Sequence, residues 1–358
     1  MPQQIEIHHR LLRDDSDDHR RVAVEVSRCV DVVSVQHGPG IWGGEGGSYV
    51  LEFVRALAVP AVATLHAVPR QPSEAERAVI AALAAEAQAT VVMSRAAADR
   101  LTADYGVDPD RVAVIDHGVL DLPLVEPETM KPALELEGRD VILSFGLMAP
   151  GKGYEDMIEA LPAVVASHPT ACYVIVGATL AEQVASHSEA YRRSLMERVG
   201  ALGLTGHVRF VDRFVGRVEL TRWLEAADVF VTPYRDHDKD SSGTLAYAMG
   251  AGRAVVATPY ACAVELLGDG RGVVAASGRP ADLATAIEGL LADPDRRAEI
   301  GRRAYEHTRS MTWPQVGAAY RELYTRVARD AHVAAGSPAP VRPMGETRRG
   351  PATASERR

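Results

Sequence analysis

The stretch DSSGTLAYAMGAGRAVVATPY, residues 240–260, places small and hydroxyl-bearing residues at the start of a predicted helix. Those residues are Ser241, Ser242, Gly243 and Thr244. The start of a helix leaves backbone N–H groups unpaired and carries about half a positive charge. Small residues allow an anion to approach these groups closely. The pattern predicts a phosphate or diphosphate site, and an ordinary serine N-cap is the alternative that the spacing leaves open.

A second loop combines glycines with a lysine after a predicted buried strand. It lies in SFGLMAPGKGYEDMIEAL, residues 144–161, and contains Gly146, Gly151, Lys152 and Gly153. A lysine and a helix start that face one ligand would neutralise a phosphate together. The loop is not a P-loop, because Gly153 stands where that motif requires Ser or Thr. We predict that this loop binds the same anion, and a solvated lysine in a turn is the alternative.

Six glycines lie between a strand and a helix in QHGPGIWGGEGGSYVL, residues 36–51. Such a density of glycine permits close approach of the backbone to a ligand. Glu45 and Trp42 are suited to hydrogen bonding and stacking with a sugar. We predict Gly43, Gly44 and Glu45 on the acceptor or sugar side of a site, against the alternative of a long turn with a structural tryptophan.

Two histidines end predicted strands. His66 ends VATLH and His117 ends AVIDH. Ligands of open α/β sheets bind beyond the carboxyl ends of the strands, so both positions are candidates for the site. A lone histidine is more often structural than catalytic, and the pattern by itself leaves both readings open.

Ten short apolar runs supply the strands that position these loops. They occur at 30–37, 60–67, 90–94, 111–118, 140–146, 172–178, 207–212, 228–233, 254–259 and 272–276. Continuous apolar runs indicate strands buried on both faces, which is typical of parallel sheets covered by helices. Between them, Ser73 and Glu76 predict a capping box for a helix through Glu86, and Ser94 predicts the cap of a helix through Asp104. The sequence therefore predicts an α/β protein.

Composition excludes several classes of protein. The 358 residues are 47% apolar and carry a formal net charge of −9, which disfavours a general nucleic-acid binder. The three cysteines are too far apart for a disulfide framework or a metal site. No apolar run of about 18 residues occurs and the start does not read as a signal peptide. We expect a cytoplasmic protein, with peripheral contact to the inner face of the membrane left open.

Six elements in order resemble the group 1 retaining glycosyltransferases of the GT-B fold, over residues 20–327. They are FGLMAPGKG, YVIVGA, HVRFVDRF, AADVFVTPY, LAYAMGAGRAVVATP and LLGDGRGVV. MTWPQVGAAYRELYTRV looks like the closing helix of the family, and the histidine of TLH, His66, matches its cleft histidine. The resemblance implies two facing Rossmann-type doubly wound domains with a cleft between them.

The resemblance also implies a division of the chain. We expect an incomplete acceptor-side domain at 1–122, a linker at 123–138 and a nucleotide-sugar-binding domain at 139–312. A crossover helix at 313–329 and a disordered tail at 330–358 would follow. Little precedes the strand at 30–37 where the family has further elements. We therefore expect a truncated first domain or a partner subunit that completes it.

The implied activity is hexosyl transfer, with retained configuration, from a nucleotide-sugar donor to an unidentified sugar, lipid or small-molecule acceptor. Lys152 and His66 are the catalytic candidates, and His117 is placed on the acceptor side. The scheme needs no cofactor and no metal. The spacing of DHDKD, residues 236–240, suits a hard cation, but Lys239 and the adjacent helix start already supply positive charge there.

Three positions depart from the family pattern. Tyr247 and Lys239 stand where the family has two glutamates, one for the nucleotide ribose and one for the donor sugar. Leu147 stands where an arginine accompanies the loop lysine. Phosphate neutralisation is thus expected from Lys152 and the 241–244 amides, with Tyr247 in the place of the ribose ligand.

These departures keep two alternatives open. One is a catalytically impaired or partner-dependent GT-B-fold binding protein, which the missing carboxylates favour. The other is a nucleotide-sugar epimerase, for which Glu45 and Glu265 are the candidate acid and base residues. A nicotinamide dehydrogenase is disfavoured, because no G-x-G-x-x-G follows an early strand.

Overall fold

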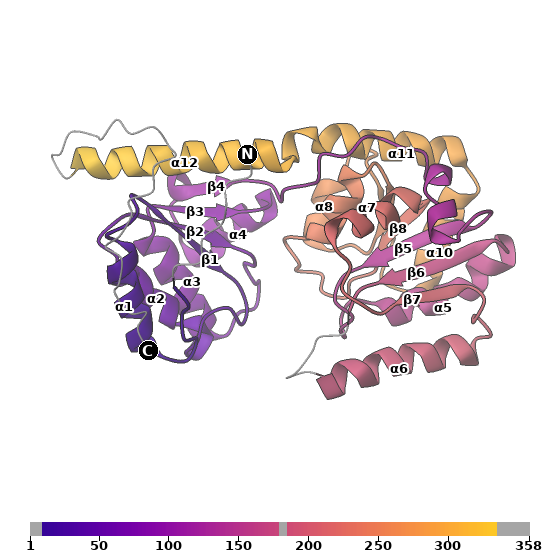
Figure 1. Cartoon of the computed structure of the whole chain (residues 1–358), viewed down its shortest axis with the longest axis horizontal. Coiled ribbons are helices and arrows are strands. Elements are labelled where there is room, and N and C mark those ends of the chain that lie inside the picture. Colours follow the sequence, from indigo (N-terminus) through magenta and orange to yellow (C-terminus); the bar gives the residue numbers. More distant parts are fainter. Residues whose placement is uncertain (1–8, 179–184, 335–358) are drawn as a thin grey trace, which may run out of the picture. The chain divides into compact units, whose positions relative to one another are not determined.

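The computed structural model describes residues 9–178 and 185–334, which form two compact units (Figure 1). Unit 1 contains residues up to 116 together with those from 317 onward, and unit 2 contains residues 117–316. The predicted linker, 123–138, belongs to unit 2 and includes two short 3-10 turns, Pro127–Thr129 and Pro132–Leu134. Each unit is built on its own parallel sheet.

Unit 1 has a four-stranded sheet in the order β1-β2-β3-β4. The strands are β1 (Val33–His37), β2 (Ala61–Leu65), β3 (Ala89–Val92) and β4 (Val112–Val114). The helices of its first 116 residues are α1 (Ser16–Val26), α2 (Tyr49–Arg55), α3 (Glu74–Glu86) and α4 (Arg95–Tyr105). The order runs in one direction without reversal, so the described strands form one half of a doubly wound sheet.

The chain returns to unit 1 through α12 (Trp313–Ala334). Two tyrosines of this helix contact strand residues: the hydroxyl of Tyr324 donates to Ser34 Oγ at 2.9 Å, and that of Tyr320 lies 3.4 Å from Thr64 Oγ1. α12 ends at Ala334, so its last turn continues past the predicted end at residue 329 into the part predicted as a disordered tail. The rest of the predicted tail, 335–358, lies outside the described residues.

Unit 2 has a six-stranded sheet in the order β10-β9-β8-β5-β6-β7. The strands are β5 (Asp140–Phe145), β6 (Ala171–Val176), β7 (Val208–Val211), β8 (Val229–Thr232), β9 (Ala254–Ala257) and β10 (Val273–Val274). The helices are α5 (Tyr154–Ser167), α6 (Ala185–Ala201), α7 (Arg217–Ala226), α8 (Gly243–Gly250), α9 (Ala261–Leu266), α10 (Pro280–Leu291) and α11 (Pro294–His307). The order reverses between β5 and β8, which is the point where ligands bind in open α/β sheets.

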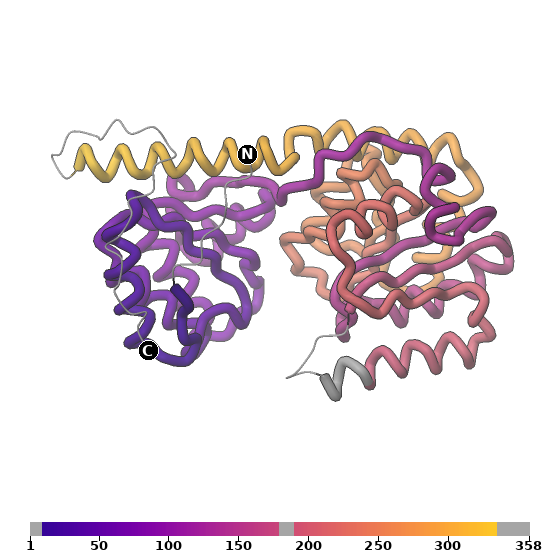
Figure 2. Tube along the Cα trace, in the orientation of Figure 1, coloured from indigo at the N-terminus to yellow at the C-terminus, as the bar shows by residue number. Residues whose placement is uncertain are grey.

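Apolar residues on both faces of the second sheet explain why its strands are buried. One core packs the sheet against α5, α6 and α10, and the other packs it against α7, α8 and α9. Segment 118–122 lies beside a segment from far along the chain (Figure 2). Val119 pairs with Thr312, and the hydroxyl of Tyr305 donates to Leu122 O. The predicted strands, the capping box at Ser73 and the cap at Ser94 are confirmed.

A buried ion pair ties the segment before β5 to the start of β8. Lys131 and Asp228 are 2% and 4% exposed, and Lys131 Nζ lies 2.8 Å from Asp228 Oδ2. The same carboxylate accepts the N–H of Val141 at 2.7 Å. Lys131 also pairs with the exposed Glu128. Removal of Asp228 would leave the buried ammonium with only the exposed Glu128 and would take the acceptor from the Val141 N–H, whereas removal of Glu128 would leave the buried pair intact.

We therefore expect Asp228→Ala to lower the free energy of unfolding of unit 2 by about 3–5 kcal/mol. Glu128→Ala is the matched control, because it removes the exposed partner of the same lysine and should cost under about 1 kcal/mol. Denaturant unfolding followed by circular dichroism measures both values. Equal losses in the two variants would contradict the role assigned to the buried pair.

Candidate functional site

The candidate site lies at the switch point of unit 2, where two loops leave neighbouring strands at the same edge of the sheet. The loop after β5 contains Gly146 to Gly153 and leads into α5. The loop after β8 runs from Pro233 to Ser242 and leads into α8. Because both strands are parallel neighbours, the sheet brings the two loop starts together.

A glycine fixes the distance between these loops. Gly153 has a φ of +72°, and a Cβ at this position would lie 1.7 Å from the carbonyl oxygen of Pro233. The N–H of Arg235 donates to Gly151 O at 3.1 Å, which joins the same two loops again. Any side chain at 153 would separate them. The predicted importance of Gly153 thus has a packing explanation, whereas a Cβ on Gly151 would meet nothing within 4 Å and a φ of +85° favours glycine there.

The second predicted stretch forms the N-terminus of α8. Ser242 is the N-cap, and its Oγ accepts the N–H of Leu245 at 3.3 Å. Thr244 Oγ1 lies 2.6 Å from the hydroxyl of Tyr234 and 3.2 Å from Ser242 Oγ. Gly146 approaches the same place, since its Cβ would meet the Thr244 methyl at 3.7 Å. Gly146, Ser242, Gly243 and Thr244 therefore gather at one helix start, with Ser241 directly before the cap.

Two lysines meet at Tyr234 beside this helix start. The ammonium nitrogens of Lys152 and Lys239 lie 4.6 Å and 5.5 Å from the centroid of its ring. Both side chains are half-buried. Burial, and next the charge of Lys239, lowers the pKa of Lys152. Among the described residues neither ammonium forms an ion pair with a carboxylate, so positive charge accumulates beside the N-terminus of α8.

Lys239 lies beside the candidate site although it was not among the predicted site residues. Its positive charge was considered only as an argument against a cation bound at residues 236–240. Its position was interpreted as a lost carboxylate, and the expectation rested on Lys152 and the α8 amides. Its approach to Tyr234 depends on how the loop after β8 folds, which the sequence pattern does not specify. The neighbouring aspartates showed only an acidic loop.

Aromatic residues and a histidine border the same helix start. His117 approaches Gly243 so closely that a Cβ there would lie 2.6 Å from its Nε2. Its ring centroid is 5.8 Å from those of Tyr247 and Trp313, and Trp313 Nε1 donates to the Tyr247 hydroxyl at 3.3 Å. His117 therefore lies among the predicted donor-binding residues of unit 2, whereas it was expected beside Gly43, Gly44 and Glu45.

His66 lies at the carboxyl edge of the sheet in unit 1. Its Nε2 is 2.8 Å from Gln36 Oε1, and its backbone N–H donates to His37 O at 2.8 Å. Burial lowers the pKa of His66, and burial together with His66 lowers that of His37. His37 is buried and its Nδ1 has no hydrogen-bond partner among the described residues. Both imidazoles are therefore neutral at neutral pH.

The glycine-rich loop of unit 1 is packed more tightly than its composition suggests. A Cβ on Gly43 would lie 2.0 Å from Arg13 O, so this glycine serves packing. Gly44 has a φ of +79° and precedes Glu45, which is exposed and begins a 3-10 turn. Trp42 donates its Nε1–H to Gln36 O at 2.9 Å and stacks at a tilt on Phe53. These contacts give the half-buried tryptophan a structural role, and its stacking on a sugar stays a prediction.

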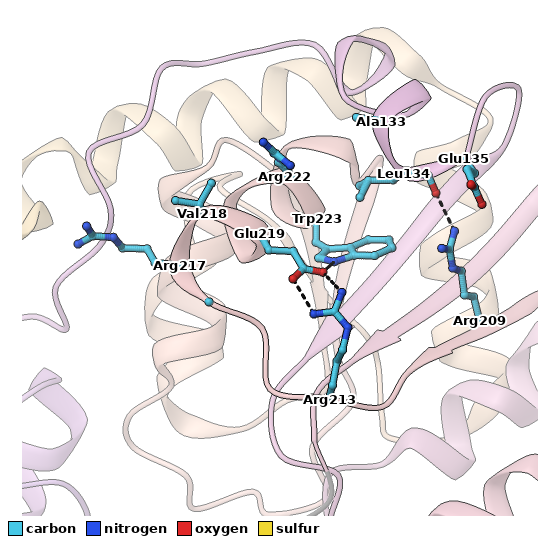
Figure 3. Close-up of a pocket in the computed structure, with 11 residues that line it drawn as sticks. Ala133, Leu134, Glu135, Arg209, Arg213, Arg217, Val218, Glu219, Arg222 and Trp223 are labelled. Carbon is cyan, nitrogen blue, oxygen red and sulfur yellow. Dashed lines mark hydrogen bonds and ion pairs between the residues drawn. The ribbon is translucent and has the colours of Figure 1, made fainter.

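A groove of about 670 Å³ between α7, β7 and residues 133–135 contains none of the predicted residues (Figure 3). Figure 3 shows Arg213 forked against Glu219, with a hydrogen bond of 2.7 Å. Arg209 lies 5.3 Å above the ring of Trp223 and donates to Leu134 O. These arginines already have partners and Trp223 is buried, so the switch point remains the better candidate for an anion.

The described residues contain no group of His, Cys, Asp and Glu side chains that could hold a metal ion. No described helix is both long and apolar enough to cross a membrane.

Comparison with family models agrees with the organisation of the chain. Residues 139–293 match the model of "Glycosyl transferases group 1", and residues 23–120 match "Glycosyltransferase Family 4". A D-inositol 3-phosphate glycosyltransferase of Catenulispora acidiphila is 32% identical over 65% of this chain and 57% of its own length. A namesake from Paenarthrobacter aurescens is 27% identical over 76% and 69%. The chain thus spans little more than half the length of the first of these relatives.

Solved structures share the fold. HepE of Anabaena in complex with UDP is 18% identical, with a TM-score of 0.71 over 87% of this chain and 82% of that one. A glycosyltransferase of Rickettsia africae is 16% identical, with a TM-score of 0.72 over 91% and 85%. Together with the two parallel-sheet units, these likenesses show that the chain has the GT-B type of fold, and the two family models match glycosyltransferase sequence in each unit.

Proposed function

We propose that the protein transfers a sugar from a nucleoside-diphosphate donor, with unit 2 holding the diphosphate. The observation that carries this proposal is the half-buried ammonium of Lys152, which lies beside the capped start of α8 at the switch point of the sheet. The lysine and the helix start come from two different loops, and both present positive charge to one place. Among the described residues Lys152 forms no ion pair with a carboxylate. A dianionic diphosphate matches that charge.

The chemistry follows from where charge develops. The bond between C1 of the sugar and the diphosphate oxygen breaks, the acceptor hydroxyl oxygen forms the new bond to C1, and the proton of that hydroxyl passes to the departing diphosphate. Negative charge then grows on the departing diphosphate. Lys152 and the N–H groups of Gly243 and Thr244 would stabilise that charge as preorganised donors, which is commonly the largest catalytic contribution. Transfer with retained configuration is part of the proposal through the resemblance to the retaining family.

The comparisons supply the first donor and acceptor to test. HepE was solved with UDP-glucose, and the curated relatives are named for D-inositol 3-phosphate. We propose UDP-glucose as the donor probe and D-inositol 3-phosphate as the first acceptor probe. A binding protein without turnover is the second candidate, favoured by Lys239 and Tyr247 at the two glutamate positions. This second candidate would be favoured if the protein binds UDP but releases no UDP from UDP-glucose with any acceptor of a panel.

We propose that His66 acts on the acceptor or sugar side as a neutral imidazole. Its lowered pKa, caused by burial, keeps it able to hydrogen bond a hydroxyl at neutral pH. Its hydrogen bond to Gln36 orients the ring.

Lys152→Met should reduce kcat for UDP release by roughly 100- to 1000-fold, because it removes a preorganised charge from the leaving group. Initial rates with UDP-glucose measure the change. Arg296→Met is the control, since it removes an exposed cation of α11 that is not part of the site. A Lys152 variant as active as the control would exclude the lysine from the mechanism.

The affinity for UDP should fall as pH rises through the lowered pKa of Lys152. The ammonium form binds the anion, so affinity is level below that pKa and declines above it, earlier than for an exposed lysine. The bound anion raises the pKa again, and binding therefore takes up protons in this range. Calorimetry in buffers of different ionisation enthalpy measures the uptake. In Lys152→Met this early decline should be absent, and a pH profile identical to that of the unmodified protein would contradict the assignment.

His66→Ala should lower kcat while leaving UDP affinity within about twofold, because the diphosphate ligands belong to unit 2 and the substitution removes no charge at neutral pH. Rates with UDP-glucose and UDP calorimetry provide the two values. A parallel loss of UDP affinity would place the histidine in the donor site.

A further inference from the structure

We propose that Lys239 is a second cation of the diphosphate site, and that the two lysines make the protein select donors with two phosphoryl groups over donors with one. This inference rests on the proposed function and specifies the chemical class of its leaving group. It assigns a binding role to the residue that stands at one of the glutamate positions of the resembled family.

Composition makes the pair of lysines stand out. The chain contains 39 Lys and Arg residues, of which only Lys131, Lys152 and Lys239 are lysines. Lys131 already forms the buried ion pair with Asp228. The two others both meet the ring of Tyr234. A lysine offers a compact point charge with rotatable donors, which suits a phosphoryl oxygen in a narrow loop better than the planar fork of arginine.

The surface beneath the two ammonium groups is fixed. Tyr234 is 6% exposed, its hydroxyl lies 2.6 Å from Thr244 Oγ1, and its ring lies 5.3 Å from that of Tyr260. Because Thr244 belongs to the first turn of α8, the tyrosine links the lysines to the helix start. Both cations therefore lie near the start of α8, where the backbone N–H groups of Gly243 and Thr244 are proposed to bind the diphosphate.

The backbone of Lys239 is also held. The N–H of Cys262 donates to Lys239 O at 3.0 Å, and the N–H of Ala261 donates to His237 O at 3.0 Å. The loop after β8 is thus tied to the start of α9. The backbone of Lys239 is thus already held before a ligand binds. Ligand binding therefore need not order this loop, and less conformational entropy is lost.

Electrostatics favour an anion between these groups. Lys239 contributes to lowering the pKa of Lys152, which is the signature of two like charges near one another. Asp236, Asp238 and Asp240 flank Lys239 in sequence, but no ion pair of Lys239 with a carboxylate is found within the described part of the chain. Two half-buried ammonium groups near one another repel, and an anion that contacts both lowers this repulsion. Lys239 thus supplies the charge that Leu147 does not.

The proposed selectivity for diphosphates follows from the number of phosphoryl groups that a ligand offers to the two lysines. A nucleoside diphosphate offers a separate phosphoryl group to each lysine. A nucleoside monophosphate offers one group, which can satisfy Lys152 and the α8 amides but leaves Lys239 without a partner. Removal of Lys239 should therefore weaken the diphosphate and have little effect on the monophosphate.

The test compares UDP and UMP by calorimetry on the full chain, with Lys239→Met, Lys239→Arg and the control Arg296→Met. We expect Lys239→Met to weaken UDP by roughly 10- to 100-fold, the loss of one charged hydrogen bond, and UMP by less than about threefold. Lys239→Arg should retain part of the UDP affinity, and the control should match the unmodified protein. Circular dichroism checks that each variant is folded.

Several results would overturn the inference. If Lys239→Met leaves the UDP affinity unchanged while Lys152→Met lowers it, Lys239 does not bind the diphosphate, and the proposed function is unaffected. Equal losses for UDP and UMP would refute the selectivity. If the protein binds no nucleotide, the proposed function fails, and inorganic pyrophosphate against phosphate becomes the probe. Pyrophosphate binding that depends on Lys239 would then still support the two-cation site, and binding independent of it would refute it.

Discussion

The close approach of Gly153 to the carbonyl of Pro233 is the constraint on which the candidate site depends. It holds the loop after β5 against the loop after β8 at a distance that no other residue type at 153 would allow. Each loop carries one lysine, and each leads into the start of a helix. Without this contact Lys152 and Lys239 would not share the ring of Tyr234, and the charge of two loops would not meet at the start of α8.

Much of this arrangement could be predicted because it depends on backbone rules. Continuous apolar strands predicted parallel sheets, and the edge of a parallel sheet predicted which loops converge. The capping residues Ser73, Ser94 and Ser242 act locally, so their helices began where the sequence indicated. Lys152 and the 241–244 stretch were predicted as site residues for the same reason, since each lies in a loop that follows a strand and leads into a helix.

The remainder depended on tertiary contacts that no local pattern specifies. Lys239 lies in an acidic loop whose path is set by hydrogen bonds to the start of α9. His117 ends a predicted strand of the first sheet, yet its ring lies against Gly243 because the chain passes into unit 2 at this residue. Trp42 sits in a glycine-rich loop that suggested a ligand, but its indole N–H is satisfied by a backbone carbonyl within unit 1.

The exchange of a carboxylate for a lysine at 239 changes what the site can tolerate when it is empty. A glutamate there would carry a charge opposite to that of Lys152, whereas Lys239 adds to burial in lowering the pKa of Lys152, so the two ammonium groups repel each other in the unliganded protein. An anion that binds both ammonium groups relieves that repulsion in addition to forming its own contacts. In the proposed reaction this relief is lost when the diphosphate leaves, so the same arrangement is expected to bind the product tightly. Turnover is then expected to depend on how readily the loops around Tyr234 release the diphosphate, which would make the anchors of those loops determinants of rate as well as of affinity.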